Sequence, residues 1–392
     1  MPPEELAKIL GLAPPPPPAE PIPEGRSARM AWFDEACHWT EYVGVDTPEG
    51  AFVVATADRH IGRGLFVKRA RPEFRVLGIT VMALEVLLGH EGVADRALVD
   101  VGANIGTTTV SALRSHAFAS AVCLEPEEGN FRLLQTNLAL NGLADRVRAL
   151  PVGVSNEAGR ATLVVHEENG GSSWIALDAQ RLAAVEAARA ETAHELAIEE
   201  PPPTRTVQIE TATLDGLVAD GVIDPAALGL IWIDTEGHEG HVLKGAAGVL
   251  EGGVPVVMEI DPVAFEQRGD AGLVRELTTA HYSHFIDVRR RKEMDGTPRL
   301  EVWPVSELAD HAAKLGGIDR PQHTDVLLVR LDDRRLQRAS SLAGEIKARR
   351  DRLRSEQPED QGATKGSQRR RQSRGTSDSR SAPSSSDARS AS

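Results

Sequence analysis

The sequence predicts an α/β protein built on a mostly parallel sheet with helices on both faces. Short, continuously apolar segments typical of buried strands recur along the chain. Stretches with the 3.6-residue periodicity of amphipathic helices separate these segments. A third observation argues against a transmembrane helix, because the chain contains no run of 18 apolar residues.

The strand-then-helix pattern begins at residue 97. A strand at 97–101 leads through a glycine turn into a helix at 107–116, and a strand at 119–124 leads into a helix at 126–141. Pro126 suits the first helical position, and Gly142 suits the end of that helix. Residues 160–166 alternate like an additional strand outside this rhythm. The other expected strands are 147–150, 228–233, 254–260, 285–288 and 326–331.

The composition divides the chain into segments around this core. Five consecutive prolines near the start are typical of an extended, solvated arm. Apolar spacing before the core predicts a strand at 52–55 and a helix at 73–89. The predicted segments are a proline-rich disordered arm (1–28), an N-terminal extension packed on the core (29–95), the main domain (96–332) with a helical insertion (174–204), a charged helix (333–356) and a disordered Ser/Arg-rich tail (357–392).

Charge and cysteine content exclude several classes of protein. Residues 333–392 contain 15 Lys or Arg and 8 Asp or Glu, against 29 and 50 in residues 1–332. An acidic body with only 4% aromatic residues argues against a nucleic-acid partner. Two cysteines cannot build a disulfide framework, and Cys123 sits in an apolar run that predicts burial. Because the N-terminus also lacks the pattern of a secretory signal, we expect a cytoplasmic location.

The first group of candidate functional residues lies in the turn after the strand 97–101. Asp100, Gly102, Asn104 and Gly106 occupy the point where a strand ends and a helix begins, which is where ligands bind in open α/β sheets. A dinucleotide site would require glycine at 104 and 107, and these positions are Asn and Thr, so a nicotinamide cofactor is disfavoured. Asp100 suits a cationic ligand such as an ammonium or a sulfonium.

Glu125 is the second candidate. It ends the strand 119–124 and follows Gly106 by 19 residues, where a carboxylate can accept both hydroxyls of a ribose. For the neighbouring Glu127 and Glu128 we expect a different role, since acids at the start of a helix are stabilised by its dipole.

The third group is an acidic cluster after the strand 228–233. Asp234, Glu236 and Glu239 follow this strand, and Glu259 lies at the end of the next. Such a cluster could take a proton from a hydroxyl, with Asp234, Glu236 and Glu239 as catalytic candidates. Alternatively, Asp234, Glu236 and Glu259 could hold a divalent metal ion. We expect the nearby His238 and His241 to be exposed on the first helical turn.

Taken together, these segments resemble the FkbM-type S-adenosylmethionine-dependent methyltransferases. The resemblance spans roughly residues 73–331 and keeps the family's order of segments. The sequence departs from that family at Trp232, where Lys is usual, and at Thr235, where Val is common. The matching segments are VDVGANIG (99–106), LEPEEGNFRLLQTNLALNG (124–142), NGGSS (169–173), TLDGL (213–217), IDTEGHEGHVLKGA (233–246), MEI (258–260) and TDVLLV (324–329).

The resemblance implies a class I methyltransferase fold, a Rossmann-like sheet of seven strands with the last one antiparallel. It implies S-adenosylmethionine as cofactor and O-methylation of a hydroxyl on a sugar, glycan, lipid-linked or secondary-metabolite acceptor. Glu125 would hold the ribose, and Asp234 is the first choice for the base. Ser172 and Ser173, in a glycine-rich loop, are candidates for orienting the substrate. The four residues of the first group, Asp100, Gly102, Asn104 and Gly106, would surround the methionine part of the cofactor.

Two other functions stay open from the sequence. The chain could be a cofactor-binding scaffold that has lost catalysis, although the acidic cluster argues against this. It could also methylate a protein, although the chain has no Asn/Asp-Pro-Pro-aromatic motif for an amide or amine. The oligomeric state and the identity of the acceptor are not encoded in any feature that we recognise.

Overall fold

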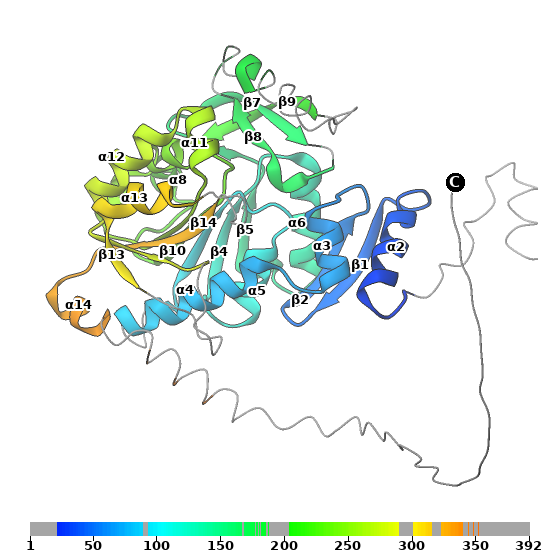
Figure 1. Cartoon of the computed structure of the whole chain (residues 1–392), viewed down its shortest axis with the longest axis horizontal. Helices are drawn as coiled ribbons and strands as arrows, with labels where there is room; N and C mark the ends of the chain where they lie inside the picture. Colours follow the sequence, from blue (N-terminus) through cyan, green and yellow to red (C-terminus); the bar gives the residue numbers. More distant parts are fainter. Residues whose placement is uncertain are drawn as a thin grey trace, which may run out of the picture. The chain divides into compact units, whose positions relative to one another are not determined.

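An eight-stranded sheet forms the centre of residues 1–350, the first of two compact units in the chain (Figure 1). The computed structural model describes residues 22–88, 93–166, 168–176, 204–289, 301–315 and 323–339, with isolated positions between 178 and 187 and between 344 and 352. The strand order is β13-β12-β14-β11-β10-β3-β4-β5. The strands are β3 (Ala97–Val101), β4 (Ser120–Leu124), β5 (Val147–Leu150), β10 (Leu228–Ile233), β11 (Val256–Ile260), β12 (His284–Asp287), β13 (Val302–Pro304) and β14 (Thr324–Val329).

Strand direction in this sheet confirms the predicted fold class. The pairs from β5 through β4, β3 and β10 to β11 are all parallel. Strand β14, the last of the seven predicted strands, runs antiparallel to its neighbours β11 and β12, and the edge strand β13 runs antiparallel to β12. All seven predicted strands are present within two residues of their expected ends. The short edge strand β13 is an addition that the sequence did not predict.

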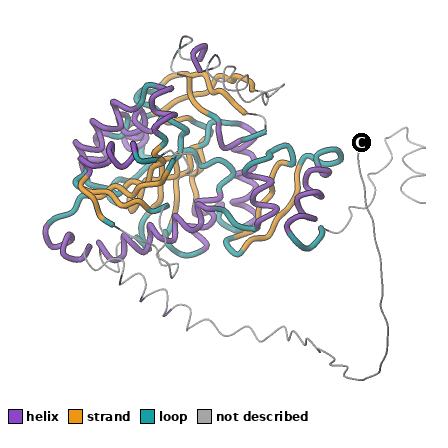
Figure 2. The backbone as a smooth tube through the Cα atoms, viewed as in Figure 1, coloured by secondary structure: helices purple, strands orange, loops and turns teal. Residues whose placement is uncertain are grey.

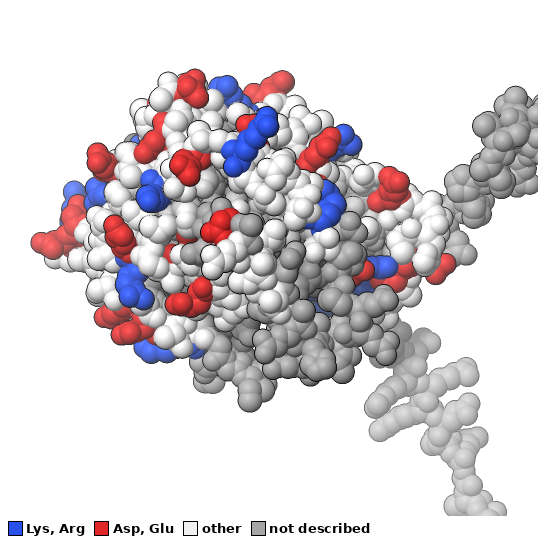
Figure 3. Space-filling view, turned by 90° about the horizontal axis from the view of Figure 1, so that it is seen from above, with Lys and Arg blue, Asp and Glu red and all other residues white. Residues whose placement is uncertain are grey.

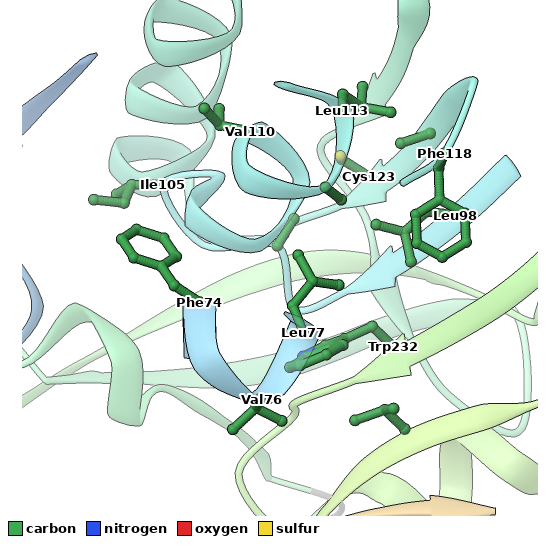
Figure 4. Packing of buried hydrophobic residues seen from close by; sticks show 14 of the residues in the cluster. Phe74, Val76, Leu77, Leu98, Ile105, Val110, Leu113, Phe118, Cys123 and Trp232 are labelled. Atoms are coloured by element: carbon green, nitrogen blue, oxygen red, sulfur yellow. The ribbon is translucent and has the colours of Figure 1, made fainter. Parts of the chain in front are cut away.

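Alternate residues of each strand enter two separate cores, one on each face of the sheet. In β3, Leu98 packs into the first core, while Val99 packs into the second. Trp232 of β10 lies in the first core against Leu77 (Figure 4), which explains an apolar residue at this position. Helices α4 (Pro72–Leu88), α5 (Thr107–Arg114) and α6 (Glu128–Leu140) cover the first core. Helices α8 (Leu214–Ala219), α9 (Glu239–Lys244), α10 (Ala247–Glu251), α11 (Pro262–Arg268), α12 (Ala271–His281) and α13 (Leu308–Ala313) cover the second.

An N-terminal hairpin is joined to the core through asparagine side chains. Strands β1 (Tyr42–Thr47) and β2 (Gly50–Ala55) pair antiparallel between helices α2 (Arg26–Ala36) and α3 (Ile61–Lys68). Asn137 and Asn141 of α6 bond the backbone of Val53 and Ala51, so their amides take the place of a neighbouring strand. The predicted strand at 52–55 and helix at 73–89 are confirmed by β2 and α4. Helix α2 begins inside the range that was predicted as the proline-rich arm.

A second, four-stranded sheet follows β5 (Figure 2). It consists of β6 (Gly153–Val154), β7 (Gly159–His166), β8 (Trp174–Ala176) and β9 (Thr204–Ala212). The additional strand predicted at 160–166 is confirmed as β7, whereas β9 was not predicted. Most of the predicted helical insertion, most of the charged helix after α14 (Asp333–Ala339) and the Ser/Arg-rich tail lie outside the described residues.

Within the described part of the chain, every helix is too short or too polar to cross a lipid bilayer. On the face drawn in Figure 3, acidic and basic side chains are interspersed over the described residues. The predicted burial of Cys123 is confirmed, since its side chain is fully buried in β4.

Candidate active site

A cavity of about 330 Å³ opens at the carboxyl ends of β3, β4 and β10. It lies where ligands are expected in an open α/β sheet. Two of the residues proposed from the sequence, Gly106 and Glu239, do not line it. The sequence candidates that the fold brings together here are Asp100, Gly102, Asn104, Glu125, Ser172, Ser173, Asp234, Glu236 and Glu259.

The glycine loop after β3 is held against the turn after β10. Gly102 has a φ of 80°, and a Cβ on it would come within 2.0 Å of the Asp234 carbonyl oxygen. Only glycine therefore allows the two backbones to approach this closely. Gly106 has a φ of 87° and precedes α5, and a Cβ there would lie 2.7 Å from Leu134 Cδ1. The missing side chain allows Leu134 of α6 to pack against this turn, and Gly106 does not line the cavity.

Glu125 joins the glycine loop to the start of α6. Its Oε2 accepts a hydrogen bond from the backbone N–H of Asn104 at 2.8 Å, and its Oε1 accepts one from that of Glu127 at 2.7 Å. Burial raises the pKa of Glu125 to about 7, although these two hydrogen bonds favour the ionised form. Each carboxylate oxygen keeps a lone pair for a further donor. Glu127 caps α6 by accepting from Asn130 N, which confirms the role expected for this acid.

Asp100 is the most deeply buried carboxylate of the cavity wall, with 1% of its surface exposed. Its Oδ2 accepts a hydrogen bond from the Thr109 hydroxyl at 2.6 Å. The Thr109 hydroxyl also lies 3.1 Å from Cys123 Sγ, so β4 helps to position it. Burial, with a smaller contribution from nearby Asp234, raises the pKa of Asp100 to about 7. A cation bound beside Asp100 would favour its ionised form.

Three carboxylates gather at the other end of the cavity. Oxygens of Asp234, Glu236 and Glu259 all lie within 4.8 Å of one another. Burial and the charge of Glu73 raise the pKa of Asp234 to about 6, while burial and Asp234 raise that of Glu236 to about 8. Glu236 has a φ of 55°, a left-handed conformation that is costly for a non-glycine residue and is found mainly where the surroundings enforce it.

The structure separates Glu239 from this cluster. Its side chain is fully buried, and its Oε1 accepts hydrogen bonds from the backbone N–H of Thr235 at 2.9 Å and from the Thr235 hydroxyl at 3.1 Å. Burial raises the pKa of Glu239 to about 8. The residue therefore holds the turn that carries Asp234 and Glu236, and it has no face on the cavity.

The expectation that His238 and His241 are exposed is wrong. Only 3% of His238 is exposed, and its Nε2 lies 3.0 Å from the Ser155 hydroxyl. Nδ1 of His241 lies 2.5 Å from Asp270 Oδ1, and the two imidazole rings stack with their centroids 4.6 Å apart. Burial lowers the pKa of His238 to about 3, so the ring is neutral. Both histidines anchor the start of α9 away from the cavity.

Sequence comparison adds to this geometry. Residues 100–290 match the family model described as "Methyltransferase FkbM domain". Residues 100–290 are called the FkbM domain from here on, after this match. Methyltransferase sdnD of Sordaria araneosa is 31% identical over 154 residues, which cover 38% of this chain and 59% of that protein. The chain thus spans less than two thirds of the length of this relative.

Solved structures show more remote likenesses to the chain. TYW2 of Pyrococcus horikoshii in complex with MeSAdo has a TM-score of 0.34 and 10% identity, covering 74% of this chain and 72% of that one. The tRNA m1G37 methyltransferase of M. jannaschii has a TM-score of 0.33 and 8% identity, covering 74% and 55%. TM-scores this low say nothing about function.

Several residues outside the FkbM domain complete the cavity wall, and sequence analysis did not identify them. His60, Arg71 and Glu73 come from the N-terminal elements, and His323 precedes β14. Arg71 Nε pairs with Glu73 Oε2 at 2.8 Å. These residues carry no motif, and only the tertiary packing of α3, α4 and β14 brings them to the site.

Arg289, inside the FkbM domain, is the one described member of a basic run at 289–292. Its guanidinium lines the cavity, bonding Asp325 Oδ2 at 3.0 Å and lying 3.7 Å from Glu259. The other three residues of the run lie outside the described part. Arg289 therefore places a positive charge beside the carboxylates of Asp325 and Glu259.

The serine loop of the FkbM domain also reaches the cavity. Ser172 receives a hydrogen bond from the Asn169 side chain at 2.5 Å. The Ser173 hydroxyl is buried and has no hydrogen-bond partner among the described residues. A buried hydroxyl without a partner in a cavity wall is stabilised by a ligand that can bond to it.

Proposed function

We propose that the chain is an S-adenosylmethionine-dependent O-methyltransferase that acts on a hydroxyl of a sugar, glycan, lipid-linked or secondary-metabolite acceptor. The observation that carries this proposal is the arrangement of acids in one cavity. Asp100 and Glu125 lie beside the glycine loop, and Asp234 lies at the adjoining turn, where its main chain contacts Gly102. The FkbM domain supports the choice of cofactor.

The residues beside the glycine loop fit the cofactor. Glu125 keeps a lone pair on each oxygen after accepting from Asn104 and Glu127, as two ribose hydroxyls require. Asp100 offers a buried negative charge to a cationic methionine part, and Gly102 and Asn104 line the same wall. When bound, S-adenosylmethionine supplies a methyl group that its positively charged sulfur has already activated for transfer.

The chain's own contribution is position and a base. Holding an acceptor oxygen in line with the methyl group can contribute about 7–11 kcal/mol of the rate enhancement. We assign Asp234 as the group that takes the hydroxyl proton on its carboxylate oxygen, because it lines the cavity next to the glycine loop. General base catalysis of this kind contributes typically about 10²–10⁴-fold. Glu236 and Glu259 surround Asp234 on the side where the acceptor would lie.

Calorimetric titration with S-adenosylmethionine and S-adenosylhomocysteine tests the cofactor assignment. We expect affinity in the micromolar range, no binding of NAD, and at least about tenfold weaker binding by the Glu125→Ala variant. A folded protein that binds neither sulfur compound contradicts the proposal.

A methyl-transfer screen with labelled cofactor over hydroxylated sugars, lipids and secondary metabolites then tests the reaction. Transfer to a hydroxyl supports the proposal. Transfer only to a protein, or binding without any transfer, supports one of the two alternatives left open by the sequence.

A further inference from the structure

A five-residue segment, 170–174, runs along the cavity wall from the cofactor end to the acidic end. At its start, the Gly170 carbonyl accepts hydrogen bonds from the side-chain amides of Asn104 at 2.9 Å and Asn130 at 3.1 Å. At its end, the Trp174 ring lies under the guanidinium of Arg268, with 5.1 Å from Cζ to the ring centroid. Every residue from Gly170 to Trp174 lines the cavity.

The first attachment of this segment is tied to the proposed ribose site. Asn130 donates its backbone N–H to Glu127 Oε2 at 2.7 Å, and Glu127 donates its own to Glu125 at 2.7 Å. Arg205 fixes the other Glu127 oxygen at 2.6 Å. A displacement of Glu125 is therefore passed to Asn130, and through its amide to Gly170.

The second attachment is tied to the acidic end. A Cβ on Gly237 would come within 2.8 Å of Arg268 Cδ and Nη1, so the glycine beside Glu236 makes room for this arginine. Burial lowers the pKa of Arg268, and Glu236 is the neighbouring charge that opposes this shift most. Arg268 does not line the cavity, and its contact with the Trp174 ring and its charge near Glu236 connect it to the site.

The middle of the segment has no freedom to shift independently. A Cβ on Gly171 would lie 2.5 Å from Cδ1 of Ile61, a buried residue of α3. Ile61, from the N-terminal elements, therefore contacts the segment closely at Gly171. The buried hydroxyl of Ser173, which has no hydrogen-bond partner among the described residues, is carried between the two attachments.

From these contacts we infer that residues 170–174 transmit cofactor binding to the acceptor end, with Asn130 and Arg268 as positioning residues. The inference rests on the proposed function and adds the segment that links its two halves. Binding at Glu125 and Asn104 fixes Gly170, and this places the Ser173 hydroxyl and the Trp174 ring for the acceptor. Neither Asn130 nor Arg268 touches the reacting atoms.

Hydrogen–deuterium exchange with S-adenosylhomocysteine as the probe tests this link without a known acceptor. In the full chain we expect saturating probe to slow exchange both in 168–176 and in 262–270. In Asn130→Ala the probe binds within about threefold of the wild-type affinity, but the slowing at 262–270 falls to less than about half. Thr136→Ala, on an exposed turn of the same helix, is the matched control and behaves as wild type.

A second pair of variants guards against a general loss of structure. Gly171→Ala should abolish the slowing at 262–270, because the added methyl group meets Ile61 Cδ1. Ile61→Val removes that carbon, so the double variant G171A/I61V should recover most of the slowing. The inference is overturned if the probe slows exchange at 262–270 in Asn130→Ala as much as in the wild type. It is also overturned if the double variant does not regain this slowing. A wild-type chain that does not bind the probe at all contradicts the proposed function instead.

Discussion

Asn137 Oδ1 accepts the backbone N–H of Val53 at 2.7 Å, which links α6 to the edge of the N-terminal hairpin across 84 positions of the chain. The Asn137 amide also donates to the Ile105 carbonyl at 2.8 Å, in the loop that leads into α5. One fully buried side chain therefore connects the hairpin to the glycine loop after β3.

Replacing Asn137 by Ala should lower the free energy of unfolding by about 3 kcal/mol, because three backbone groups, the N–H and carbonyl of Val53 and the carbonyl of Ile105, lose their partner. Urea unfolding monitored by circular dichroism measures this change. Asn141→Ala removes comparable bonds to Ala51 at a half-buried position, so it should cost only about 1 kcal/mol. Equal losses in the two variants would show that burial does not determine the effect.

Cofactor binding should tighten as the pH rises. Burial raises the pKa of both Asp100 and Glu125 to about 7, so both are mainly protonated in the free protein at about pH 6. A bound cation and ribose hydroxyls favour the ionised carboxylates, so binding releases protons. The dissociation constant should fall by up to about tenfold per group between about pH 5.5 and about pH 8.

Calorimetry in buffers of different ionisation enthalpy measures the released protons directly. Asp100→Asn should flatten the pH dependence for S-adenosylmethionine more than for S-adenosylhomocysteine, which lacks the charged sulfur. A Kd that is independent of pH, with no proton release, would place the cofactor away from both carboxylates.

Asp234 and Glu239 should respond differently to amide substitution. Asp234→Asn removes the proposed base, so we expect kcat to fall by about 10²–10⁴-fold while cofactor affinity changes little. Glu239→Gln keeps an acceptor for Thr235, and Glu239 is already mostly protonated at neutral pH because its pKa is raised to about 8. Its kcat should stay within about threefold of wild type. Steady-state kinetics of the two variants tests the assignment. An equal loss of kcat in both variants would contradict it.

Chelation separates the two chemistries that the acidic cluster allows. If Asp234 acts as a base without a metal ion, turnover after dialysis against EDTA should equal that of the untreated protein. Loss of turnover that Mg²⁺ or Mn²⁺ restores would assign Asp234, Glu236 and Glu259 to a metal site instead. Cofactor titration of the same dialysed sample controls for unfolding.

The sequence was sufficient for seven strands of the central sheet and for the acids that line the cavity beside the glycine loop. Strands such as 97–101, apart from Asp100, and 228–233 contain no polar side chain, so their positions and their buried state could be predicted directly. Glu125 followed from its place at the end of a strand. The hairpin strand β1 alternates between buried and exposed residues but includes Gly44 and Asp46, which have low strand propensity and obscured it.

The acidic end could be predicted only in part. Glu239 and Asp234 look equivalent in sequence, since each follows a strand at a helix start. Which one reaches the cavity depends on the left-handed turn at Glu236, which no local pattern specified. Arg71 and Glu73 were missed because only the tertiary packing of α4 brings them to the site.

The contact between Gly102 and the Asp234 carbonyl has a consequence for engineering. Because the two loops meet main chain to main chain, the backbone sets the spacing between the glycine loop and Asp234, and so between the proposed methyl donor and the proposed base. A redesign for a new acceptor should therefore leave the contact between Gly102 and the Asp234 carbonyl unchanged. The positions to vary are His60, Arg71 and His323, which line the same cavity but lie outside the FkbM domain.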